Sequence, residues 1–206
     1  MATENNYLIQ ARQAKQRFLS YDQDGLIRKF RLDHDDTFLY VNLLCKLYRI
    51  SRTTGDLEWL GNGLWQDGNS YEEVMTLLDL LCDSREDRCV SGRWKSMESF
   101  GRMFHRNLLE ERRNPMADRF DANPEGLKKA CLALGGTPIP GADIGYAVEL
   151  FDGLPIALQF WHGDEEFCPR LRYLWDENAL QYLRYETMYF AVNLLLRRIL
   201  EFSGKL

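Results

Sequence analysis

The segment from Trp161 to Pro169 is the most suggestive part of the sequence for chemistry. It reads Trp-His-Gly-Asp-Glu-Glu-Phe-Cys-Pro, so an imidazole precedes three consecutive carboxylates and a thiol follows them. Carboxylates, imidazoles and thiolates bind divalent metals, and carboxylic acids and histidines act as general acids and bases. We therefore expect a ligand-binding or metal site here, with His162, Asp164 and Glu166 as candidate metal ligands.

The same carboxylates also have a purely structural interpretation. Acidic side chains beside a chain reversal can cap a following helix and stabilise its positive end. The sequence has no His-x-x-x-His, Glu-x-x-His or His-Glu-x-x-His pair that would strengthen a metal assignment. Capping and ligand binding therefore stay open as alternatives for this segment.

Three other places carry titratable side chains. The run Asp33-His34-Asp35-Asp36 is either a solvated loop or a metal site, and His105 is either a hydrogen-bonded core histidine or a ligand. Glu186 lies between apolar residues of a predicted helix, so we expect it to be partly buried. A buried carboxylate needs a partner or a raised pKa, and Arg184 is the nearest candidate partner in sequence.

Familiar catalytic templates and paired cysteines do not occur. There is no Gly-x-Ser-x-Gly elbow, no phosphate-binding Gly-x-x-x-x-Gly-Lys-Ser/Thr loop and no complete dinucleotide fingerprint. No two cysteines have the two-residue gap of a zinc ribbon or a redox pair. We expect free thiols in a reducing compartment at all five positions, which are Cys45, Cys82, Cys89, Cys131 and Cys168.

The elements that must position these residues follow from hydrophobic spacing and turn residues. A capping box at Ser70 and Glu73 predicts a helix through Leu81, and Asp152-Gly153 predicts a hairpin turn. The remaining expectations, in chain order, are a helix from Thr3 to about Tyr21, a break at 22–25, strands at 38–44, 46–50 and 57–59, a loop at 61–69, a helix at 97–108, a helix from Pro124 to Gly135, strands at 143–151 and 155–161, and a long helix from Leu180 to Ile199.

Composition bounds the class of protein. The chain has 206 residues, 45% of them hydrophobic, and a formal net charge of -5. This acidic balance argues against a nucleic-acid binder, and no apolar run is long enough to span a bilayer. The polar start resembles no signal peptide, so we expect a cytoplasmic protein without membrane partners.

The order of the expected helices and strands predicts one α+β domain over residues 1–206, with an antiparallel sheet, helices packed on it, a long C-terminal helix and no internal repeat. The N-terminal helix and strands would occupy about residues 1–60.

A series of short strings in the C-terminal half carries a resemblance. They are Gly135-Gly136, Gly141-Ala142-Asp143 with Ala147, Pro155, Trp161-x-Gly-Asp-Glu-Glu-Phe167, Leu174-Trp175-Asp176, and Tyr182-Leu183 with Glu186. Together they resemble the bacterial and archaeal domain-of-unknown-function family 3786, over about residues 91–200 and more faintly over 38–58. The resemblance implies a protein of anaerobes with some relatives joined to iron–sulfur domains, and it implies no particular activity. The chain lacks a ferredoxin-like cysteine run, so we expect no cluster within it.

These observations lead to one functional prediction and two alternatives. We predict a small-molecule-binding or accessory protein of anaerobic redox or corrinoid-linked metabolism. The sequence does not identify its ligand or cofactor, for which a divalent metal and a corrinoid- or tetrapyrrole-type molecule are the candidates. Trp161 and Phe167 would form apolar walls, and Glu186 would orient the acidic loop. The ligand-binding set is Trp161, Asp164, Glu165, Glu166, Phe167, Glu186 and Asp143. The alternatives are a metal-assisted enzyme that uses His162 and the acidic loop, and a protein-interaction module whose acidic loop attracts a basic partner.

Overall fold

The computed structural model describes residues 6–100 and 114–203. The chain divides into two compact units, and each is described by itself. The first unit comprises Met1–Cys89 with Leu180–Leu194, and the second comprises Val90–Ala179 with Leu195–Leu206.

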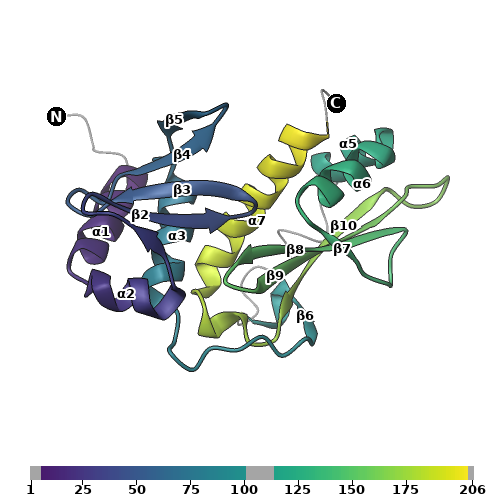
Figure 1. Cartoon of the computed structure of the whole chain (residues 1–206). Coiled ribbons are helices and arrows are strands. Elements are labelled where there is room, and N and C mark those ends of the chain that lie inside the picture. The colour runs from purple at the N-terminus through teal and green to yellow at the C-terminus, as the bar shows by residue number, and fades with distance from the viewer. Residues whose placement is uncertain (1–5, 101–113, 204–206) are drawn as a thin grey trace. The chain divides into compact units, whose positions relative to one another are not determined.

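The first unit is built around an antiparallel meander with the strand order β1-β2-β3-β4-β5 (Figure 1). In β2, Leu39, Val41 and Leu43 are buried while the residues between them are partly or fully exposed, so this sheet has one core face. In chain order the elements are α1 (Asn6–Leu19), α2 (Gln23–Phe30), β1 (Asp33–His34), β2 (Phe38–Leu43), β3 (Lys46–Ser51), β4 (Leu57–Gly61), β5 (Leu64–Asp67) and α3 (Tyr71–Asp83).

The predicted capping box at the start of α3 is confirmed. The Ser70 hydroxyl accepts a hydrogen bond from the backbone N–H of Glu73 and donates one to its carboxylate, at 2.5 Å. The Tyr48 hydroxyl of β3 donates to the same carboxylate at 2.8 Å. Glu73 therefore ties the beginning of α3 to the sheet as well as capping the helix.

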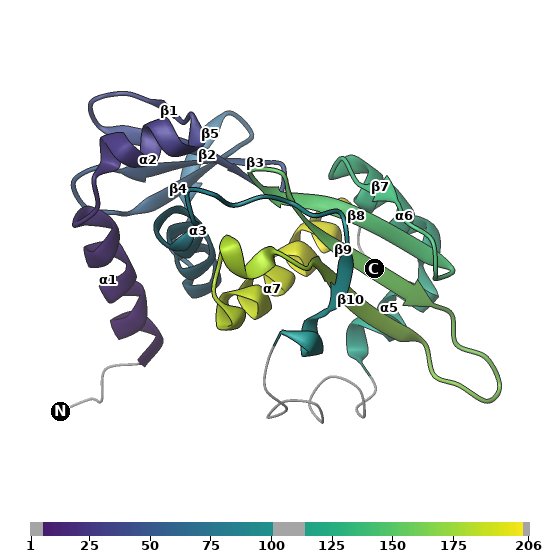
Figure 2. The same ribbon diagram turned by 90° about the horizontal axis from the view of Figure 1, so that it is seen from below.

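The second unit contains another antiparallel sheet, with the strand order β6-β10-β9-β8-β7. Figure 2 shows α5 and α6 on one face of this sheet, and the rings of Phe120 in α5 and Phe160 in β9 meet there with centroids 6.4 Å apart. The elements are β6 (Trp94–Ser96), a short 3-10 turn (Met97–Ser99), α5 (Pro115–Ala122), α6 (Pro124–Ala133), β7 (Thr137–Pro138), β8 (Ile144–Phe151), β9 (Leu154–Trp161) and β10 (Arg170–Asp176). A second 3-10 turn (Ala179–Gln181) leads to α7 (Tyr185–Phe202), which contributes residues to both units.

The α+β class, the antiparallel pairing and the long C-terminal helix agree with the sequence-based prediction, but there are two sheets where we expected one.

The Asp152-Gly153 turn is confirmed, with φ of 50° and 78° at its two residues. The predicted loop at 61–69 is wrong because Asn62 and Gly63, with φ of 52° and 77°, turn the chain into β5. The predicted break at 22–25 is also wrong, since Asp22 is the N-cap of α2. Of the helix expected at 97–108, the structure describes a single 3-10 turn, and residues 101–113 lie outside the described residues.

The two halves of the described chain repeat one order of elements. Each has two helices, a two-residue strand, a hairpin, a further strand and a final helix, from α1 to α3 and from α5 to α7, and the first half has in addition β5 between β4 and α3. The second helix of each half has the same start, since Asp22 and Asn123 are N-caps and a glycine stands three residues later, at Gly25 and Gly126. A Cβ at either glycine would collide with that capping side chain. The chain therefore contains a structural repeat, contrary to our expectation.

The repeat extends to the register of the strands. In the first half Val41 pairs with Tyr48, two residues beyond the hairpin's closing pair, and Tyr48 pairs with Trp59. In the second half Ile156 holds the corresponding place and pairs with Trp175. Equivalent positions of β4 and β10 thus both carry tryptophan.

No helix within residues 6–100 and 114–203 has the length and apolar composition needed to cross a bilayer.

Candidate functional site

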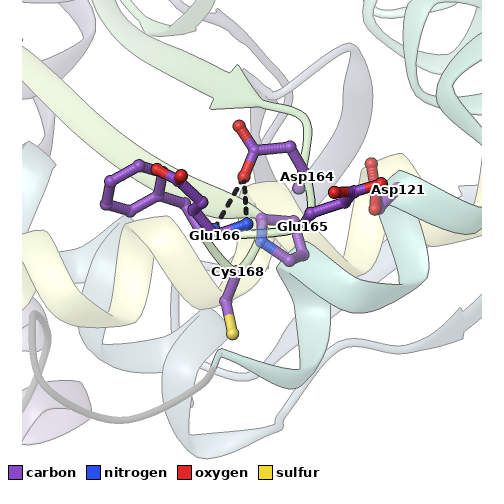
Figure 3. A pocket seen from close by; sticks show the side chains of 8 residues that line it. Asp121, Asp164, Glu165, Glu166 and Cys168 are labelled. Atoms are coloured by element: carbon purple, nitrogen blue, oxygen red, sulfur yellow. Dashed lines mark hydrogen bonds between the residues drawn. The ribbon is translucent and has the colours of Figure 1, made fainter.

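The segment singled out from the sequence forms the connection between β9 and β10. Trp161 is the last residue of β9 and Arg170 the first of β10, and the two pair directly at the base of the connection. We call residues 162–169 the acidic loop. A pocket of about 540 Å³ lies against it, and Figure 3 shows the side chains that line it. The lining residues are Asp121 from α5 and Gly163, Asp164, Glu165, Glu166, Phe167, Cys168 and Pro169 from the acidic loop.

Asp164 fixes the shape of the acidic loop. Its Oδ1 accepts hydrogen bonds from the backbone N–H groups of Glu166, at 2.8 Å, and Phe167, at 2.7 Å (Figure 3). Its own N–H donates to the carbonyl of Phe167 at 2.9 Å. An aspartate that bonds its own following backbone is a common turn device. Asp164 therefore caps a turn, where the sequence suggested the cap of a helix as the structural alternative.

His162 is held from two directions at the start of the acidic loop. Its imidazole Nδ1 lies 2.8 Å from Oδ1 of Asp121, and its backbone N–H donates to Oδ2 of Asp143 at 2.9 Å. Its ring also packs edge-on against Phe160, with centroids 5.1 Å apart. The histidine therefore belongs to a small cluster that joins α5, the entry to β8 and the acidic loop.

Glu165 and Glu166 are the carboxylates of the acidic loop that remain available to a ligand. Both are exposed, both line the pocket, and neither forms an ion pair or a side-chain hydrogen bond with any other described residue. In Figure 3 the Cys168 thiol points to the opposite side of the loop from the Asp164 carboxylate. The chemistry offered to the pocket is therefore mainly uncompensated negative charge.

The two predicted apolar walls differ in position. Phe167 lines the pocket and is 69% exposed. Trp161 is half-buried and is not among the lining residues, and the Arg170 guanidinium lies over its ring at 5.6 Å from the centroid. The structure thus brings Phe167, but not Trp161, to the pocket.

A model of one protein family matches this chain over residues 25–198, and its description is Domain of unknown function (DUF3786). The chain belongs to the DUF3786 family. The match begins well before the region near residue 91 in which the sequence resemblance was strongest, so it includes most of both halves of the structural repeat. No curated protein and no solved structure matches the chain.

The structure of this DUF3786 protein lends no support to a metal centre in the regions that it describes. Within residues 6–100 and 114–203, no three His, Cys, Asp or Glu side chains are grouped so that they could hold a metal ion. In the cluster at 33–36, Asp35 caps a turn instead, because its Oδ1 accepts from the N–H groups of Thr37 and Phe38 at 2.7 Å each. The other candidate, His105, lies outside the described residues.

Glu186 differs from our expectation. It is exposed rather than partly buried, and it has no partner among the described residues. Its expected partner Arg184 instead contacts Asp83 of α3, with Nε 2.9 Å from Oδ2. Of the apolar residues near Glu186, Leu183 precedes α7 and Met188 is buried on another face of this helix, which is why spacing alone misplaced Glu186. Glu186 belongs to the first unit and the acidic loop to the second.

Asp121 is the site residue that sequence reasoning missed. It lies near the end of α5, an element we did not predict, and 41 residues before His162. Asn114 followed by Pro115 is the sequence signal for the start of this helix, since Asn114 accepts from the N–H of Met116 at 3.0 Å as its cap. The pairing of Asp121 with His162 has no sequence signal of its own.

Proposed function

We propose that this protein is a binding or accessory protein whose acidic loop holds a positively charged group. The observation that carries the proposal is the pair Glu165 and Glu166, which are exposed, line one pocket and lack a counter-charge among the described residues. The carboxylates of Asp121 and Asp164 add two further negative groups to the lining. A concave surface of one sign raises the local concentration of ions of the other sign.

The charge of the pocket also selects between the predicted ligands. A tetrapyrrole that bears carboxylates is disfavoured, because like charges repel in the pocket. An organic cation is favoured over a tightly chelated metal, because the carboxylates are spread along a loop. The cytoplasmic setting in anaerobic redox or corrinoid-linked metabolism remains part of the proposal, on the strength of the family resemblance.

A second candidate function is recognition of a basic segment of a partner protein, and the exposure of Phe167 favours it. An aromatic ring that is 69% exposed next to carboxylates offers a partner both apolar area and charge complementarity. A lysine-rich peptide would then use Phe167, whereas a small polyamine would depend on the carboxylates alone.

Calorimetric titration with spermidine tests the proposal. We expect binding that weakens at least several-fold in the double variant Glu165→Gln/Glu166→Gln and as salt is raised, because the attraction is electrostatic. The control is Asp33→Asn/Asp36→Asn, which removes the same number of charges from exposed residues that do not line the pocket. Equal weakening in both double variants would contradict a specific site. A lysine-rich peptide whose binding is lost in Phe167→Ser, while spermidine still binds, would favour the second candidate.

A further inference from the structure

Strand β10 carries two buried polar groups whose hydrogen-bonding capacity is unused. Trp175 is completely buried, and its indole Nε1 has no hydrogen-bond partner among the described residues. The hydroxyl of Tyr173 is also buried and has no partner among them. Burial alone raises the pKa of this hydroxyl, since no charged group contributes. Both groups therefore enter the interior as hydrogen-bond donors.

The two side chains lie on the same face of the second sheet, among apolar residues. Tyr173 pairs with Leu158 and Trp175 with Ile156, so the two donors are two residues apart and point to one side. The same row of β9 continues to Phe160, which packs against Phe120 of α5. Leu158, Ile156 and Phe160 are buried and offer no polar atom to either donor.

The structural repeat shows how the equivalent donor is satisfied in the other half. Trp59 holds the position in β4 that Trp175 holds in β10, as the strand register shows. The Trp59 Nε1 donates to the backbone carbonyl of Asp67 in β5 at 3.0 Å. The neighbouring strand thus supplies an acceptor in the first unit. In the second unit β6 is the neighbouring strand, with Lys95 opposite Trp175, and no described residue supplies an acceptor.

A buried donor without an acceptor lowers the folding equilibrium constant by roughly 5- to 100-fold. Because buried donors in folded proteins almost always have an acceptor, two such donors on one face of one strand are most simply explained by a bound acceptor that is not a protein side chain or backbone group. The acceptor is uncharged, because the β9 residues beside both donors are apolar and an ion buried without a counter-ion is strongly disfavoured. The cation opposite Trp175, Lys95, is exposed and already pairs with Glu177.

We propose that Tyr173 and Trp175 form an internal binding site, in which both donate hydrogen bonds to one uncharged oxygen acceptor. The acceptor is either an ordered water or the carbonyl or hydroxyl oxygen of a small neutral molecule. This site is separate from the acidic loop, since neither residue lines the loop's pocket.

The variant Tyr173→Phe tests the site, because it removes the hydroxyl and keeps the ring. We expect the folding equilibrium constant, measured by urea unfolding, to fall about fivefold as a satisfied hydrogen bond is lost. The matched control is Tyr146→Phe. Tyr146 lies opposite Leu158 on the same face of the sheet, but its hydroxyl is not one of the buried groups that lack a hydrogen-bond partner. An unchanged or increased folding constant in Tyr173→Phe, relative to this control, would overturn the proposal.

The indole N–H signal of Trp175 provides a second readout in the folded protein. It is assigned by its disappearance in Trp175→Phe, and we expect it to shift in Tyr173→Phe because the two donors share an acceptor. A signal that does not move would overturn the shared site. Native mass spectrometry separates the two sources: an added organic mass that is lost in Tyr173→Phe identifies a small molecule, and no added mass with a shifted indole signal identifies water.

Discussion

The imidazole Nδ1 of His162 lies 2.8 Å from the Asp121 carboxylate, although 41 residues separate the two in the chain. The contact joins the end of α5 to the first residue of the acidic loop and so sets one edge of the pocket. Asp121 contributes both an acceptor for the histidine and a negative charge for a ligand. Substitutions can separate these two contributions.

The variant Asp121→Asn keeps an oxygen acceptor and removes the charge. We expect spermidine to bind up to about fivefold more weakly, which is the range of one exposed ion pair. The variant Asp121→Ala also releases His162, so it should in addition broaden or shift the His162 ring signals in an NMR spectrum. Identical ring spectra for the two variants would contradict a positioning role for Asp121.

The acceptor function of Asp164 can be tested in the same way. Asp164→Asn retains an oxygen for the N–H groups of Glu166 and Phe167, whereas Asp164→Ala leaves both without it. We expect Asp164→Ala to weaken spermidine binding more than Asp164→Asn does, because the turn that presents Glu165 and Glu166 loosens. The free energy of unfolding should change by less than about 1 kcal/mol in either variant, since the loop is exposed. A larger loss would mean that the turn supports the fold rather than the site.

Local signals in the sequence predicted those parts of the fold that local chemistry determines. The capping box at Ser70 and the Asp152-Gly153 turn are of this kind, because each satisfies its own backbone within a few residues. The hairpin at Leu44 and Cys45 lies between correctly predicted strands, yet its turn residues have φ of 49° and 54°, which their side chains disfavour. The number of sheets and the contact of Asp121 with His162 depend on long-range packing, so spacing along the chain could not reveal them.

The turn at Leu44 and Cys45 predicts opposite effects at neighbouring positions. Cys45 is exposed with positive φ, so Cys45→Gly should raise the free energy of unfolding by about 0.5–1 kcal/mol. Leu44 is 2% exposed, so Leu44→Gly should lower it by about 2–3 kcal/mol despite the same relief of strain. Gly153→Ala is the control for strain alone, because a Cβ added at Gly153 would meet no other atom within 4 Å, and it should cost about 1 kcal/mol. Urea unfolding measures all three, and a destabilised Cys45→Gly would contradict the argument.

The five cysteines should divide into two classes by reactivity. Burial raises the pKa of the Cys82 and Cys131 thiols to about 12 each, so neither forms an appreciable amount of thiolate near neutral pH. Cys45, Cys89 and Cys168 are exposed. We expect iodoacetamide to modify these three in the native protein and all five after unfolding in urea, as peptide mass mapping would show. Modification of Cys82 in the native protein at the rate of Cys168 would contradict the assignment.

Two aspartates of the first unit should affect stability in opposite directions as the pH falls. Burial raises the pKa of Asp79 above its ordinary 3.8, although Arg17 and Thr187 both donate to it at 2.6 Å. Asp79 therefore takes up its proton more readily in the folded state, and its contribution to stability grows as the pH falls through the raised pKa toward 3.8. Hydrogen bonds from Lys15 and Thr54 lower the pKa of Asp56, so its contribution is present above the ordinary pKa and is lost as the pH falls toward the depressed value.

Urea unfolding of the wild type, Asp79→Asn and Asp56→Asn between about pH 7 and about pH 3 distinguishes these effects. The free-energy difference between wild type and Asp79→Asn should move in favour of the wild type as the pH falls to about 4. The difference between wild type and Asp56→Asn should stay constant to about pH 4 and then move against the wild type. Each variant serves as the control for the other, because both remove one carboxylate from the same unit. Parallel pH profiles for the two variants would show that burial and hydrogen bonding do not set these two pKa values in opposite directions.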